Sequence, residues 1–113
     1  YAPEKYEYPI NRYTMEVKRQ LDVLDRNLAD RPFMIGDDYS IADMAIYPLY
    51  EVLVTGEIYN AQEFLNVASY EHVNRWAREI EQRPGVQRGS RVNRTWGDED
   101  QRVPERHSAA DFK

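Results

Sequence analysis

The sequence predicts an all-α fold, a bundle of about four or five helices followed by an extended C-terminal arm. Three observations support this prediction. Apolar residues recur every three or four positions between residues 10 and 28, Ser40 and Asp43 form a pattern that opens a helix, and no stretch alternates convincingly as a strand would. The 113 residues, 42% of them apolar, suffice for one core. We therefore expect one helical domain over residues 1–86 and a tail over residues 87–113.

The first predicted helix lies within residues 10–28. One stripe carries its apolar side chains, which are Ile10, Tyr13, Val17, Leu21, Leu24 and Leu28. The positions between them carry charges of both signs, including Asp25, and this pattern predicts a solvated outer face. Arg31-Pro32 ends the helix, because the residue before a proline disfavours helical backbone.

Ser40 and Asp43 predict the start of the next helix. Each side chain can bond to a backbone N–H group that the first turn leaves unpaired, which is the arrangement of a capping box. A catalytic acid/base pair is the competing interpretation, but capping explains the spacing, so we predict a structural role for both residues. The positions that follow are apolar on nearly every side, which predicts a helix enclosed by others.

A further helix is predicted after Ser69, which stands where a helix-capping residue is preferred. Its apolar face consists of Val73, Trp76, Ala77 and Ile80. Arg83-Pro84-Gly85 should end it. From Gln87 onward apolar residues become sparse, so we expect the tail to lie over the helices or to be partly disordered.

Composition excludes several classes of function. The absence of cysteine rules out disulfides and thiolate chemistry within these residues, and it suits a reducing cytoplasm. A net charge of −5 argues against nucleic acid as the main partner. No run approaches the roughly 18 apolar residues of a membrane span, so we expect a soluble protein. The isolated His72 and His107 lack the spaced partners of a metal site or catalytic triad.

One stretch, residues 36–43, reads Gly-Asp-Asp-Tyr-Ser-Ile-Ala-Asp. It resembles the start of the sixth helix in the C-terminal domain of glutathione transferases. Further segments are similar to the bacterial nu class, which includes disulfide-bond oxidoreductases. They are Tyr1-Ala-Pro-Glu-Lys5, Arg12-Tyr13-Thr14, Arg75-Trp76 and Val92-Asn93-Arg94. The resemblance extends over nearly the whole chain, and because the chain begins at Tyr1 rather than methionine, we expect a fragment of a longer protein.

The resemblance implies that this chain supplies the co-substrate-binding and dimerisation domain of a cytoplasmic, glutathione-dependent transferase or disulfide reductase. It implies a homodimer, a thioredoxin-like N-terminal domain that is absent from this chain, and no catalytic residue and no metal here. The partners it implies are glutathione, as co-substrate, and a small hydrophobic electrophile, peroxide or disulfide. The alternative function is a non-catalytic interaction module, since the same helical domain occurs in proteins without enzymatic activity.

The residues implied for the site lie near the start of the chain. Arg12 is either one more solvated charge or a donor to a glutathione carboxylate, for which a planar guanidinium is well suited. The resemblance favours the second role. Four tyrosines could line the binding site for the hydrophobic co-substrate, although aromatic residues at helical spacing more often pack in the core. They are Tyr1, Tyr6, Tyr8 and Tyr13.

Overall fold

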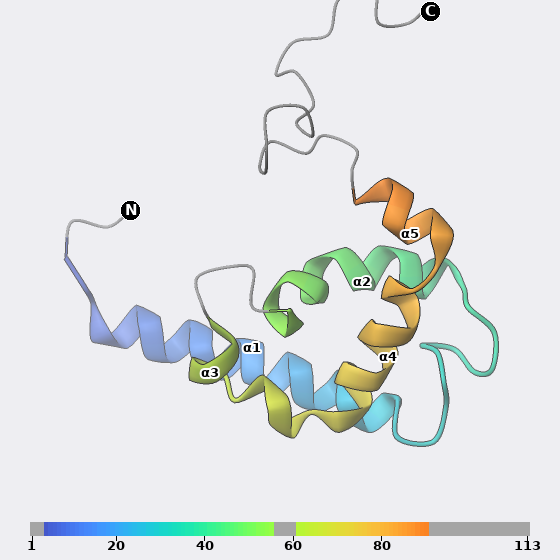
Figure 1. The fold of residues 1–113 in the computed structure, drawn as a ribbon. Coiled ribbons are helices and arrows are strands. Elements are labelled where there is room, and N and C mark those ends of the chain that lie inside the picture. The colour runs from blue at the N-terminus through green and yellow to red at the C-terminus, as the bar shows by residue number, and fades with distance from the viewer. Residues whose placement is uncertain (1–3, 56–60, 91–113) are drawn as a thin grey trace, which may run out of the picture. The chain divides into compact units, whose positions relative to one another are not determined.

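The computed structural model describes residues 4–55 and 61–90, and these residues form helices joined by turns and loops (Figure 1). The elements are α1 (Glu7–Asn27), α2 (Ile41–Val54), α3 (Ala61–Phe64), the 3-10 helix η1 (Val67–Ser69), α4 (Glu71–Glu81) and α5 (Pro84–Gly89). Within the described ranges the only extended pairing is one isolated bridge, between Phe33 and Gly36. The prediction of an all-α fold is confirmed. The chain divides into two compact units after Glu79.

The core of the first unit gathers on the predicted apolar stripes. On α1 the stripe is buried only in its second half, at Leu21, Leu24 and the C-cap residue Leu28. The loop, α2 and the following segments contribute Phe33, Tyr47, Val54, Leu65, Val67 and Tyr70, and α4 contributes Val73, Trp76 and Ala77. Burying one such large apolar side chain stabilises a fold by roughly 1.5–3 kcal/mol.

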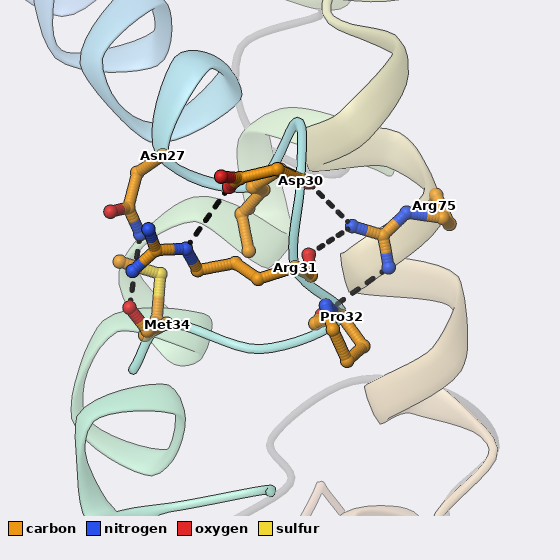
Figure 2. A network of polar contacts seen from close by, with 7 residues as sticks. Asn27, Asp30, Arg31, Pro32, Met34 and Arg75 are labelled. Atoms are coloured by element: carbon orange, nitrogen blue, oxygen red, sulfur yellow. Dashed lines mark hydrogen bonds and ion pairs between the residues drawn. The ribbon is translucent and has the colours of Figure 1, made fainter. Parts of the chain in front are cut away.

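Two polar side chains join α1 to α4 by capping each other's helix. The Asp25 carboxylate on α1 accepts hydrogen bonds from the backbone N–H groups of His72 and Val73, at 2.9 and 3.0 Å, where α4 begins. In return the Arg75 guanidinium on α4 donates to carbonyl oxygens beyond the end of α1 (Figure 2). Those acceptors are Leu28 and Arg31 at 2.9 Å and Pro32 at 3.3 Å. Each helix end thereby gains partners for groups that the helix itself cannot pair.

These contacts correct two sequence predictions. Ser69 does not cap α4: it ends η1, and its hydroxyl donates to the carbonyl of Asn66, the residue just before η1. Asp25 takes that role instead, so it belongs to an interface between helices and not to a solvated face. Sequence spacing could not show this, because the cap comes from a residue 47 positions away.

The last described segment contains a helix that was not predicted from the sequence, α5. α4 ends at Glu81, close to the predicted stop. Pro84 then opens α5 in the second unit, because its fixed backbone angle suits the first position of a helix. The boundary between residues 86 and 87 stays a prediction, and the expected tail beyond residue 90 lies outside the described residues.

Candidate functional site

The first half of α1 and the segment before it are exposed, and they carry the residues that the sequence singled out. Every side chain from Glu4 to Tyr13 is exposed, including Arg12. The exposed fractions are 53% for Tyr6, 79% for Tyr8 and 73% for Tyr13. Tyr1 lies outside the described residues. Tyr6, Tyr8 and Tyr13 therefore do not serve packing among the described parts of the chain, and the role of all four tyrosines as a binding surface stays a prediction.

Helix geometry places one of these tyrosines next to Arg12 on α1. Tyr8 and Arg12 are four residues apart, so they occupy adjacent turns of one stripe. Tyr13 follows Arg12 directly and so lies about 100° further round the helix, while Tyr6 is the N-cap residue, with extended backbone, just before the helix. The arrangement presents a cation beside aromatic surface, which suits a ligand with a carboxylate at one end and an apolar part at the other.

Glu16 lies one turn after Arg12 and is held by three hydrogen bonds. The Arg19 guanidinium donates to both carboxylate oxygens, through Nε at 2.9 Å and Nη2 at 2.7 Å. The Gln20 amide donates to Oε1 at 2.9 Å. The bonds from Arg19 and Gln20, with the attraction of Arg19 and Arg12, lower the pKa of Glu16 to about 2 against the effect of desolvation. Glu16 is thus an anion at any physiological pH.

The same network reaches α2 through Tyr50. The Tyr50 hydroxyl donates to Oε1 of Gln20 at 2.7 Å, which orients the Gln20 amide so that its nitrogen faces Glu16. Burial raises the pKa of Tyr50, so its hydroxyl remains protonated as the donor. Sequence reasoning missed this network. The i, i+3 pair of Glu16 and Arg19 was a visible signal, whereas the link to Tyr50 spans 30 residues.

Asp43 is fully buried, and its carboxylate is occupied by structural bonds. The structure contains the capping box: the backbone N–H of Ser40 donates to Asp43 at 2.9 Å, and Ser40 Oγ accepts from Ala42 N at 3.3 Å. Asp43 also accepts from Met34 N at 2.9 Å and from the Trp76 indole at 2.8 Å. Burial by itself would raise the pKa of Asp43, but these bonds outweigh it and hold the pKa below its ordinary value.

The outer face of α2 is apolar and exposed. Its exposed apolar residues are Ile41 (82%), Met44 (53%) and Leu49 (69%), together with Ala45 and Pro48. The prediction that this helix is enclosed on all sides therefore fails within the described residues. Only Tyr47 and Val54 of its apolar side chains are buried.

The described residues show neither a metal site nor a membrane span. No group of three or more histidine, cysteine, aspartate or glutamate side chains is placed to hold a metal ion in residues 4–55 and 61–90. Over the same ranges, none of the helices combines the length and the apolar character needed to cross a membrane.

The first unit has a surface pocket of about 330 Å³. It is lined by Gln62, Ala68, Glu71, Asn74, Arg75 and Arg78. None of the residues predicted for binding lines this pocket.

Comparison with known proteins places the chain among glutathione transferases. It is 56% identical over its full 113 residues to the disulfide-bond oxidoreductase YghU of Escherichia coli, of which it spans 39%. It is 50% identical over 94 residues to an uncharacterized GST-like protein of Streptococcus mutans, of which it spans 36%. To the disulfide-bond oxidoreductase YfcG of E. coli it is 32% identical over 85 residues, covering 75% of this chain and 36% of YfcG.

A solved structure agrees with this placement, and a family model matches the central part of the chain. The crystal structure of the glutathione transferase YghU from Streptococcus pneumoniae, complexed with glutathione, matches with a TM-score of 0.78 and 55% identity, over 81% of this chain and 36% of that one. A family model described as nuclear-export cofactor Arc1p matches residues 10–84. The chain therefore belongs to the Arc1p_N_like family of helical domains, in the form that YghU-like glutathione transferases carry as their C-terminal domain.

Proposed function

We propose that this chain is the co-substrate-binding and dimerisation domain of a cytoplasmic, homodimeric, glutathione-dependent transferase or disulfide reductase. The observation that carries the proposal is the exposed stripe of Tyr8 and Arg12 on α1, in a chain 56% identical to a disulfide-bond oxidoreductase. Glutathione supplies the thiol for this chemistry. No residue of this chain is proposed as a catalytic group, because the thiol-activating residue is expected in the N-terminal thioredoxin-like domain.

Arg12 is proposed to bind a carboxylate of glutathione. It is exposed, and it makes no hydrogen bond or ion pair with any part of the chain that the structure describes. Its guanidinium can therefore offer a bidentate pair of donors to a ligand. Tyr6, Tyr8 and Tyr13, with Tyr1, are proposed to contact the apolar part of an electrophile, peroxide or disulfide.

The apolar face of α2 is proposed to pack against the N-terminal thioredoxin-like domain. This chain spans only 39% of E. coli YghU and 36% of the S. mutans relative, so most of the length of those proteins lies outside the matched region. Exposed apolar side chains gathered on one helix face typically mark an interaction site. In that arrangement α2 would be enclosed, as its sequence indicates.

The experiment that tests the proposal is an assay of the full-length protein with glutathione and a small disulfide. Arg12→Ala should raise the KM for glutathione roughly tenfold or more, because one charge-assisted hydrogen bond contributes about 1.5–3 kcal/mol. Arg26→Ala is the matched control, since it removes an exposed arginine 14 residues along the same helix, about 21 Å away. An equal effect of both variants would contradict a specific role for Arg12.

A second function is favoured by one observation. The matching family model takes its description from a nuclear-export cofactor and not from an enzyme. In a non-catalytic interaction module, the exposed aromatic residues of α1 would contact a protein. Glutathione binding without any turnover of a disulfide, peroxide or electrophile by the full-length protein would favour this alternative.

A further inference from the structure

We propose that Glu16 is a positioning residue for Arg12: its carboxylate, held in place by Arg19 and Gln20, directs the Arg12 guanidinium toward the carboxylate of glutathione. The inference rests on the proposed function. It starts from the position of Glu16 between two arginines, one turn after Arg12 and three residues before Arg19.

The hydrogen bonds show which arginine is available to a ligand. Nε and Nη2 of Arg19 are both engaged by Glu16. Arg12 has no such bond among the described residues, so it is the arginine of this pair that can turn outward. Glu16 Oε1 accepts two bonds and Oε2 accepts one, which leaves acceptor capacity on Oε2 for a neighbour in the preceding turn. Arg12 is within side-chain reach from that turn.

The carboxylate itself is fixed from the neighbouring helix. Tyr50 on α2 donates to Gln20, and Gln20 donates to Glu16. A chain of hydrogen bonds thus runs from the half-buried Tyr50 through Gln20 to Glu16, the first acidic residue after the exposed segment 4–13. The structure records no bond between Glu16 and Arg12, but the spare acceptor site on Oε2 offers Arg12 an ion pair across one helical turn. Such a pair would restrict the rotamers of Arg12, and the ordering of its long side chain would then cost less when the ligand binds.

The direction in which glutathione affinity changes when Glu16 is removed distinguishes a positioning role from a purely electrostatic effect. Glutathione is an anion, so a Glu16 that acted only through its charge would weaken binding, and its removal would strengthen the affinity. Positioning predicts the reverse. Glu16→Ala in the full-length protein should weaken glutathione binding roughly three- to tenfold in titration calorimetry, with kcat within about twofold of wild type. Tyr50→Phe, which changes no charge, should weaken binding in the same direction.

A double-mutant cycle with Arg12→Ala decides whether Glu16 acts through Arg12. If it does, Glu16→Ala causes no further loss once Arg12 is replaced, because the two effects are not additive. Glu63→Ala, which removes an exposed glutamate on α3, serves as the charge-matched control and should leave the affinity unchanged.

Two results would overturn the inference while leaving the proposed function intact. One is an Arg12→Ala variant that binds weakly beside a Glu16→Ala variant that binds as well as wild type or better. The other is an equal loss from Glu16→Ala with and without Arg12. An Arg12→Ala variant of unchanged affinity would instead remove the proposed role of Arg12, and the inference with it.

Discussion

A single carboxylate, that of Asp43, connects three parts of the first unit. It accepts bonds from the loop at Met34, from the start of α2 at Ser40 and from α4 at Trp76. It also accepts the Ser40 hydroxyl at 2.9 Å, so both carboxylate oxygens have two donors. The indole of Trp76 further packs edge-on against Tyr47, with ring centroids 5.9 Å apart. Asp43 is therefore a structural centre of the first unit.

Replacing Asp43 by asparagine should lower the free energy of unfolding by about 2–4 kcal/mol. A neutral amide cannot accept all four bonds, and hydrogen bonds to a charged group contribute about 1.5–3 kcal/mol each. Chemical denaturation of both proteins measures the difference. Ser40→Ala should cost less, roughly 0.5–2 kcal/mol, because it removes only the cap. A larger loss from Ser40→Ala than from Asp43→Asn would contradict this ranking.

The pH dependence of that difference follows from the lowered pKa of Asp43. Because the pKa is lower in the folded state than its ordinary value of 3.8, the stabilising contribution is complete well above that value. It is lost as the pH falls below 3.8 and through the folded-state pKa, since the unfolded chain then binds the proton more readily. The gap in stability between wild type and Asp43→Asn should narrow over that range. A gap that stays constant down to acid unfolding would show that Asp43 is not charged.

At the scale of elements, α1 and α4 depend on each other for their ends. Asp25 contacts the first turn of α4, where an anion also meets the positive end of the helix dipole. Arg75 contacts the carbonyls after α1, where a cation is favoured. Next to them, the Asn27 amide donates to the carbonyl of Met34 at 3.0 Å, which ties the loop back to α1 (Figure 2).

Removing the cap from α4 should destabilise the protein although it leaves the apolar core untouched. Asp25→Ala is expected to lower the free energy of unfolding by about 1–2 kcal/mol, because two N–H groups lose their acceptor. Ser69→Ala, the change that sequence alone would have chosen, should alter it by less than about 0.5 kcal/mol. Thermal unfolding of the two variants compares them directly. The reverse order would restore Ser69 as the cap.

At the scale of the whole molecule, the apolar face of α2 is exposed among the residues that the structure describes. Leu49→Glu should destabilise the full-length protein by about 1–3 kcal/mol if this face packs against the N-terminal domain, because a charge would then be buried in an apolar interface. Phe64→Glu, at an exposed position on α3, is the matched control and should have little effect. Equal unfolding temperatures for both variants would argue against the proposed contact.

The fold class could be read from the sequence because its signals are local. The stripe from Leu21 to Leu28 and the capping box at Ser40 act within one or two turns of a helix, and the structure contains both. The expectation that α2 is enclosed also came from local sequence, but it concerned a surface that no described residue of the first unit covers. For the site, the sequence indicated the exposed residues Arg12 and Tyr8, while their ligand remains a proposal.

By itself the sequence determined that the chain is helical, where α2 begins, and which family it resembles, because periodicity, capping and motif all depend on neighbouring residues. Only the tertiary structure decided the partners of Asp25, Gln20 and Asp43. Their bonds to His72, Tyr50 and Trp76 span 30 to 47 residues. Such contacts depend on how helices pack in space. The residues around a hydrogen-bonding side chain do not identify the distant group to which it will bond.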